Sequence, residues 1–166
     1  ADLPKGQNKV STYIPVARIA DMLLDPGGTV TFNGKKLTYP DIKLIYWAGG
    51  NPYHHHQDLN RLREAWSKPE TIIVNDPFWT ATARHADIVF PASTALERED
   101  FSWGRSELFG APMHQALTPY EDSRDDYAVF TGLAERLGFG ETFTEGRSPR
   151  EWIEYLWNVT LQRAAE

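Results

Sequence analysis

The chain contains no cysteine, and this absence limits the chemistry that its 166 residues can support. Disulfide bonds, thiolate metal ligands and iron–sulfur clusters all depend on cysteine sulfur. None of them can therefore form from residues of this chain. The absence leaves the cellular compartment open.

Long hydrophobic runs and clusters of positive charge are also missing. No apolar stretch reaches the roughly 20 residues that a transmembrane helix needs. The formal net charge is −6, and the lysines and arginines are scattered along the chain. We therefore expect no membrane insertion and no binding to nucleic acid, because a basic patch would be required for the latter.

Hydrophobic residues are plentiful enough for a folded core. They make up 41% of the chain, aromatic residues make up 13%, and six tryptophans are many for this length. This composition favours a folded domain over a disordered segment. The tryptophans could fill the core or cover faces that meet other domains. Because the sequence opens at Ala1 without a methionine, a processed chain and a piece of a larger protein both fit.

Alternating strands and helices predict the fold class. Runs of β-branched and aromatic residues indicate strands at residues 43–48, 71–74 and 87–90. Apolar residues at helical spacing indicate intervening helices at about 57–67 and 80–85. The alternation predicts an α/β fold, a three-layer sandwich with a mostly parallel, Rossmann-like sheet flanked by helices. Three strands are few for such a sheet, so either the sheet is completed elsewhere or further strands were not recognised.

The whole chain, residues 1–166, is predicted to form a single α/β cofactor-binding domain. Its first part, residues 1–40, holds a helix at 16–24 and a hairpin that turns at Asn33-Gly34. The remaining parts are the strand–helix core at 41–100, a long loop at 101–124 and two helices, about 125–137 and 149–163, within 125–166. A long loop in a compact domain usually has a function or lies against a neighbour.

A glycine-rich turn follows the first core strand. Gly49 and Gly50 would let the backbone approach a phosphate closely, and the Asn51 amide could meet a phosphate, a ribose or a base. An ordinary strand-to-helix turn is the alternative interpretation. The position at the carboxyl end of a strand is where α/β folds bind dinucleotides.

Polar residues come directly after the second core strand and recur between residues 80 and 100. Asn75 and Asp76 stand where nucleotide-binding units often contact the sugar or base, and a carboxylate suits the two donors of guanine. Equally, Asp76-Pro77 could only start a turn. Arg84 could contact a phosphate and Asp100 a base edge, while Thr80 and Thr82 could cap or donate hydrogen bonds.

Three adjacent histidines, His54 to His56, come directly after the glycine-rich turn. Adjacent side chains of an extended loop diverge, whereas zinc ligands are usually separated in sequence and converge. We therefore expect hydrogen bonds from one or two rings and no metal ligand, with a metal site at His54–His56 as the rival hypothesis. No nucleophile elbow and no Walker loop is present, so no catalytic residue is predicted.

Two segments together resemble a known family. Residues 50–58 read Gly-Asn-Pro-Tyr-His-His-His-Gln-Asp, and residues 86–98 read Ala-Asp-Ile-Val-Phe-Pro-Ala-Ser-Thr-Ala-Leu-Glu-Arg. They resemble the molybdopterin oxidoreductases of the dimethyl sulfoxide reductase type, and within these the S-oxide and N-oxide reductases. The region 14–23 and Asn33-Gly34-Lys35 also fit, so that the likeness covers about residues 14–138.

The resemblance implies a molybdenum bis(molybdopterin guanine dinucleotide) cofactor in the intact enzyme. It implies that Asn51 and His55 contact this cofactor, and that Asn75, Arg84 and Asp100 approach its guanosine or phosphates. The complete predicted cofactor-binding set is Gly49, Gly50, Asn51, His55, Asn75, Asp76, Arg84 and Asp100. Members of the family occur in the bacterial cytoplasm and periplasm, so the resemblance leaves the compartment open.

The chain also departs from the family pattern. Family enzymes are several times longer, and the serine that binds molybdenum in this subgroup, the substrate funnel and the opposing dinucleotide domain lie in unmatched parts. The segment after Asp100 also differs from the family's Ile-Gly. We therefore expect one domain of an S-oxide or N-oxide reductase, inactive alone, with the remaining domains of the parent enzyme as partners. A non-catalytic guanine-nucleotide-binding or interaction module of the same fold is the alternative.

Overall fold

The computed structural model describes residues 7, 10, 13–102 and 109–164, and the chain divides into two compact units. The first, Gln7–Phe90, contains the central sheet and is called the sheet unit. The second contains Pro91–Glu166 and is called the helical unit. No helix in the described ranges is both long and apolar enough to cross a membrane.

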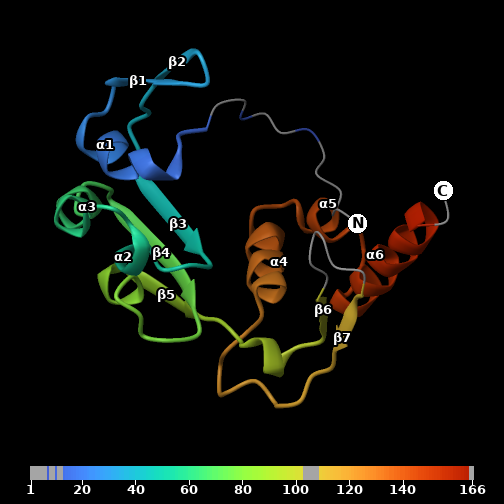
Figure 1. Cartoon of the computed structure of the whole chain (residues 1–166). Helices are drawn as coiled ribbons and strands as arrows, with labels where there is room; N and C mark the ends of the chain where they lie inside the picture. The colour runs from blue at the N-terminus through green and yellow to red at the C-terminus, as the bar shows by residue number, and fades with distance from the viewer. Residues whose placement is uncertain (1–6, 8–9, 11–12, 103–108, 165–166) are drawn as a thin grey trace. The chain divides into compact units, whose positions relative to one another are not determined.

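A three-stranded sheet forms the centre of the sheet unit. Its strands are β3 (Leu44–Ala48), β4 (Thr71–Asp76) and β5 (Ile88–Pro91), in the order β3-β4-β5 (Figure 1). β3 and β4 are parallel, with Leu44 opposite Thr71 and Ala48 opposite Asn75. The predicted mixed α/β class with a parallel sheet is therefore confirmed.

Two helices pack on one face of this sheet. They are α1 (Ile19–Leu24) and α3 (Leu59–Trp66), and their apolar residues form one buried cluster with Ile72 and Val74 of β4. Leu62, Ala65 and Trp66 share a face of α3 because residues three and four apart are neighbours on a helix. The Asp58 side chain begins α3 by accepting a hydrogen bond from the N–H of Arg61 at 3.0 Å.

The opposite face of the sheet is more open. Leu44 of β3 is 54% exposed and Ile88 of β5 is 46% exposed. Their neighbours Ile45 and Val89 pack against the buried cluster, so Leu44 and Ile88 point the other way. The described residues thus cover the two faces of the sheet unequally.

The lead-in of the sheet unit matches the predicted helix and hairpin. A 3₁₀ turn, η1 (Val16–Arg18), precedes α1, and the hairpin strands are β1 (Thr29–Phe32) and β2 (Lys35–Thr38). Asn33 and Gly34 have φ values of 48° and 73°. Two positive φ angles define the two-residue turn that joins twisted strands, which confirms this part of the prediction.

The helix predicted at residues 80–85 is shorter in the structure. Only η2 (Ala83–His85) is helical there, and it is a 3₁₀ turn. Thr80 occupies the preceding turn, where its hydroxyl accepts a hydrogen bond from the N–H of Ala83 at 3.2 Å. Threonine side chains compete with the backbone for such bonds, which favours turns over regular helix.

The helical unit contains more regular structure than the predicted long loop allowed. Within 101–124 the structure places most of β6 (Asp100–Ser102), which pairs antiparallel with β7 (Ala111–Met113). Each strand has three residues and β7 contains Pro112, so neither shows a readable alternation. Before them lies the 3₁₀ turn η3 (Ala95–Glu97).

Three helices follow instead of two. They are α4 (Asp126–Arg136), α5 (Gly140–Thr144) and α6 (Pro149–Ala164). The short helix α5 was not predicted, because five residues contain too little periodicity. The predicted helix starts are confirmed: Asp125 accepts from the N–H of Ala128, and Ser148 and Glu151 cap α6 reciprocally.

Candidate functional site

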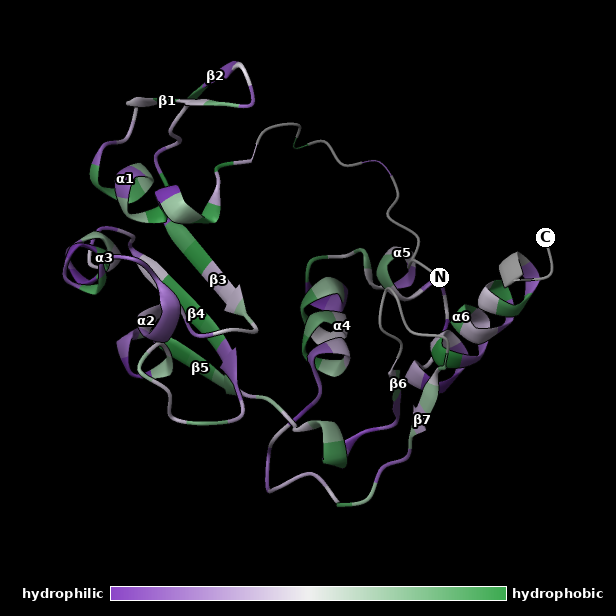
Figure 2. Ribbon diagram, in the orientation of Figure 1, coloured by the Kyte–Doolittle hydropathy of each residue, from purple (hydrophilic) through white to green (hydrophobic). Residues whose placement is uncertain are grey.

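A pocket of about 260 Å³ lies where β3 and β4 end. In Figure 2 the strands are coloured mainly as hydrophobic, and β4 turns hydrophilic at this end. The pocket is lined by Gly49, Gly50, Asn51, Asn75, Asp76, Pro77 and Thr80. Because β3 and β4 are parallel neighbours, the two predicted polar segments meet at the same edge.

The glycine-rich turn has a conformation that favours glycine. Gly49 and Gly50 have φ values of 78° and 76°, in the region that side chains disfavour. A Cβ atom on Gly49 would meet nothing within 4 Å, so backbone conformation and not space requires the glycine. Pro52 then starts the short helix α2 (Pro52–His55), where its fixed φ suits the first position.

Asn51 is held at both its side chain and its backbone. Its Oδ1 accepts a hydrogen bond from the hydroxyl of Thr82, which is fully buried. Its backbone N–H donates to Nε2 of His55 at 3.3 Å. His55 is thereby brought to the glycine-rich turn, although it does not line the pocket.

Asn75 and Asp76 close the other side of the pocket. Asn75 is 4% exposed, and its Oδ1 accepts from the hydroxyl of Tyr46 at 2.9 Å. Asp76 accepts from the N–H of Phe78 at 3.0 Å and from the hydroxyl of Thr80 at 2.7 Å. Asp76 therefore does start a turn, as one interpretation held, and its carboxylate also lines the pocket.

The other two predicted residues have different local partners. The exposed Arg84 donates from Nε to the carbonyl of Trp79 at 3.1 Å and does not line the pocket. Asp100 belongs to the helical unit, where it begins β6. Its carboxylate accepts from Nε of Arg98 at 3.1 Å and from the N–H of Phe101 at 2.9 Å.

The three histidines have three different environments. His54 is exposed, His55 binds the backbone of Asn51, and both ring nitrogens of His56 are buried with no partner in the described part of the chain. Across the described ranges, no group of three potential metal ligands converges.

Tyr46 contributes to the site but was not singled out from the sequence. It lies two residues before Ala48, the partner of Asn75 in the ladder. Alternation along β3 puts both on one face, and this signal could have identified Tyr46 once the strand pairing was known.

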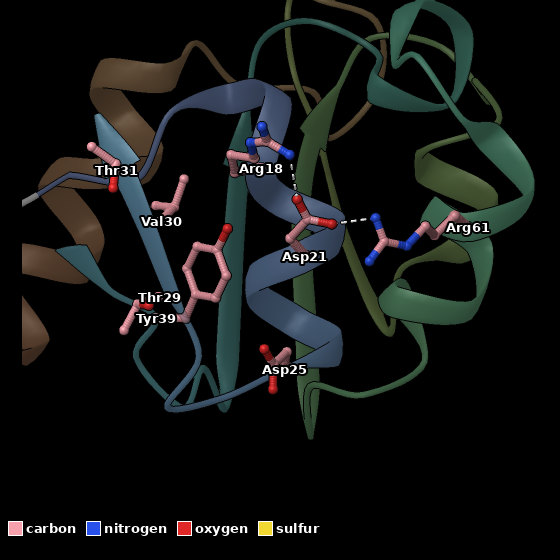
Figure 3. A pocket seen from close by; sticks show the side chains of 8 residues that line it. All are labelled: Arg18, Asp21, Asp25, Thr29, Val30, Thr31, Tyr39 and Arg61. Carbon is pink, nitrogen blue, oxygen red and sulfur yellow. Dashed lines mark hydrogen bonds and ion pairs between the residues drawn. The ribbon is translucent and has the colours of Figure 1, made fainter. Parts of the chain in front are cut away.

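A second cavity, of about 430 Å³, lies between α1, the hairpin and α3. Figure 3 shows Asp21 between Arg18 and Arg61, and both guanidinium groups pair with its carboxylate. The hydrogen bond from Arg18 and that from Arg61 lower the pKa of Asp21, against the opposing effect of burial. Both arginines that line this cavity are therefore already paired with a carboxylate of the chain itself.

Comparison with known proteins identifies the family. A family model described as molybdopterin oxidoreductase matches residues 4–136, which is most of the chain. The chain belongs to the molybdopterin oxidoreductase family. The resemblance that the two motif segments indicate is thus confirmed, and both segments lie within the matched range.

The relatives that this chain matches include S-oxide and N-oxide reductases. A biotin sulfoxide reductase of Cereibacter sphaeroides is 51% identical over 155 residues, which are 93% of this chain and 21% of the relative. A trimethylamine-N-oxide reductase of Haemophilus influenzae is 48% identical over 171 residues, covering 97% of this chain and 21% of the relative. The chain thus spans about a fifth of the length of these molybdopterin oxidoreductases.

One solved structure has a similar fold over part of its chain. Acetylene hydratase from Pelobacter acetylenicus superposes with a TM-score of 0.55 at 26% identity. The match covers 62% of this chain and 14% of that enzyme. As with the sequence relatives, the similarity falls on a small part of a much longer protein.

Proposed function

We propose that the pocket at the ends of β3 and β4 binds part of a molybdopterin guanine dinucleotide, in a molybdenum-dependent S-oxide or N-oxide reductase. The observation that carries the proposal is the convergence of Gly49, Gly50 and Asn51 with Asn75 and Asp76 on one pocket. Dinucleotides bind at the carboxyl ends of strands in parallel α/β sheets. The names of the relatives support the reaction class proposed for the parent enzyme.

The chemistry of the pocket suits a nucleotide. Gly49 leaves open space where a side chain would otherwise stand, and a Cβ atom on Gly50 would lie 3.7 Å from Nε2 of His55. Without side chains at these two positions, a phosphate can approach the backbone. Asp76 uses its carboxylate for two hydrogen bonds, but four lone-pair sites leave capacity for more. Two adjacent donors, N1–H and the exocyclic amine of guanine, match such a carboxylate. Asp76 would therefore read guanine, and His55 would support the turn.

The remaining residues of the predicted set, Arg84 and Asp100, do not line the pocket. Arg84 is exposed and has donors beyond the one that Trp79 uses, so it can turn toward a phosphate of the cofactor. Asp100 would approach the guanosine. In the parent enzyme the bound cofactor supplies oxygen-atom transfer, and these residues bind and orient it.

Further domains of the parent would complete both the site and the sheet. A pocket of about 260 Å³ lies below the usual range of about 300–1,000 Å³ for small-molecule sites, so a whole bis-dinucleotide cofactor needs further walls. The open sheet face with Leu44 and Ile88 would be covered there by a second layer, giving the three-layer sandwich of a single cofactor-binding domain.

Calorimetric titration of the chain with GMP and GDP tests this proposal, and a separate titration with AMP is the control for the base. We expect guanine-selective binding that is weak, because an isolated half-site lacks the contacts of the other domains. Asp76→Asn should weaken it by at least about tenfold, since an amide N–H₂ would face the guanine donors. Glu64→Gln is the matched control, because Glu64 is exposed on α3 and does not line the pocket.

Equal binding of GMP and AMP would contradict the guanine-reading role of Asp76. The same affinity for GMP in Asp76→Asn and in Glu64→Gln would contradict it as well. If no nucleotide binds, the proposed function of the pocket fails for this chain, and the membership of the molybdopterin oxidoreductase family is unaffected because it rests on sequence.

A further inference from the structure

We propose that the buried Thr82 is a positioning residue, which fixes the side chain of Asn51 as a hydrogen-bond donor toward a phosphate oxygen of the bound nucleotide. This inference rests on the proposed function and deepens it. It assigns the two ends of the nucleotide to two different residues: phosphate to Asn51 and base to Asp76.

The argument begins with the hydroxyl of Thr82. The side chain is fully buried, so its hydroxyl must find its partners within the protein. In the described part of the chain these partners are the N–H of Tyr53, which donates to Oγ1 at 3.4 Å, and the amide of Asn51. The Tyr53 N–H can only donate. The single proton of the hydroxyl therefore has the Asn51 side chain as its acceptor.

This decides which way the Asn51 amide faces. If Nδ2 faced Thr82, the buried hydroxyl would receive two donors and its own proton would lack an acceptor, at a cost comparable to a lost hydrogen bond. With Oδ1 facing Thr82, all three groups are satisfied. Oδ1 is then occupied, and Nδ2 is the atom that Asn51 offers to the pocket.

The backbone of Asn51 strengthens this arrangement. Its N–H donates to Nε2 of His55, so the residue is held at its backbone as well as at its side chain. Rotation about the Cβ–Cγ bond, which would exchange the two amide groups, would break the hydrogen bond with Thr82. An amide N–H₂ only donates, and a phosphate oxygen only accepts. The neighbouring Gly49 and Gly50 allow close approach of a phosphate, whereas the donor edge of guanine suits Asp76.

A ligand-free test uses the side-chain amide of Asn51 in nuclear magnetic resonance spectra of the ¹⁵N-labelled chain. The signals are identified by their loss in Asn51→Asp. We expect Thr82→Val to shift or broaden them, because the isosteric side chain lacks the hydroxyl. Thr82→Ser retains the hydroxyl and should leave them close to their original positions. Unchanged signals in Thr82→Val would overturn the positioning role.

A second test compares GDP with guanosine, which lacks phosphate. Asn51→Asp keeps the size of the side chain but replaces the donor with a charged acceptor, so GDP binding should fall at least about tenfold. Thr82→Val should lower it about three- to tenfold, and Thr82→Ser less than about twofold. Guanosine binding should change less than about twofold in each variant. An equal loss of guanosine binding would overturn the contact with phosphate.

The outcomes separate this inference from the proposed function. If GDP binds and Thr82→Val binds it equally well, the inference fails while the proposed function stands. If the unaltered chain binds no GDP, the phosphate contact falls together with the proposed function of the pocket. The amide signals then still decide whether Thr82 orients Asn51. Far-ultraviolet circular dichroism of each variant verifies that the fold is retained.

Discussion

The two units of the chain differ in how much of their apolar surface they bury. In the sheet unit Leu62 and Val74 are 0% exposed and belong to a cluster that joins α1, α3 and β4. Among the described residues of the helical unit, the buried hydrophobic ones are Ala134 and Trp152. Its Leu137 is 70% exposed and its Phe109 is 83% exposed. The units therefore have very different cores.

This difference indicates that the sheet unit is stabilised by its own core, whereas the helical unit needs contacts with other domains. The sheet unit buries a continuous apolar cluster, and all residues that line the pocket belong to this unit. The helical unit relies more on polar contacts, such as the Tyr127 hydroxyl, which donates to the carbonyl of Arg147 at 2.6 Å and accepts from Trp152 at 3.0 Å. Large exposed apolar residues in a chain that spans a fifth of its relatives fit a surface that other domains cover.

The largest expected effect comes from emptying the core of the sheet unit. Leu62→Ala should lower the free energy of unfolding by about 2–5 kcal/mol, because it leaves a cavity at a fully buried site. Leu137→Ala in the helical unit should change it by less than about 0.5 kcal/mol, since that side chain is exposed. Urea unfolding followed by tryptophan fluorescence measures both. Equal losses would refute the contrast between the two cores.

Amide hydrogen exchange compares the units without substitution. We expect the amides of β4 to exchange at least about tenfold more slowly than those of α6, because strands in a buried core open only with the whole unit. Mass spectrometry of exchanged peptides from both elements gives the two rates under one condition. Slower exchange in α6 would show that the helical unit is the more stable one.

Two glycines provide a smaller, opposite pair of effects. Gly49→Ala should destabilise the sheet unit by about 1–2 kcal/mol because of its positive φ. Gly132→Ala, inside α4, should stabilise the helical unit by about 0.5–1 kcal/mol, since only the flexible Arg136 side chain lies near the added methyl group. Thermal unfolding of both variants checks the signs. A gain in Gly49→Ala would contradict the constrained turn.

The smallest effect concerns the ion pairs of Asp21. Asp21→Asn should cost about 0.2–1 kcal/mol, because both arginines are about half exposed. The arginines lower the pKa of Asp21 in the folded state, so the stabilisation is present above the unfolded value of about 3.9 and is lost as the pH falls through the lowered value.

Unfolding measured between pH 7 and pH 2 checks this dependence. The difference between the original chain and Asp21→Asn should disappear at the acidic end. Asp122→Asn is the control, because Asp122 is exposed in the helical unit. A difference that grows on acidification would contradict the assigned direction of the pKa.

Strong local signals made much of the sheet unit predictable. Asn33-Gly34 predicted the hairpin, and the apolar runs around Ile45 and Ile72 predicted two strands. Both signals are local, because a tight turn or a short strand depends on only a few neighbouring residues. The short elements β6, β7 and α5 escaped prediction, since three to five residues contain no readable period. For the same reason a full helix was predicted at about residues 80–85, where the structure has only the 3₁₀ turn η2.

The sequence by itself determined the family, the α/β class and the two polar segments that end neighbouring strands. Only the tertiary structure decided how those segments work together. Parallel pairing brought Asp76 to the pocket beside Asn51, and burial turned Thr82 from a possible turn residue into a partner of Asn51. Contacts between residues some thirty positions apart depend on how strands and helices pack, and no local pattern encodes them.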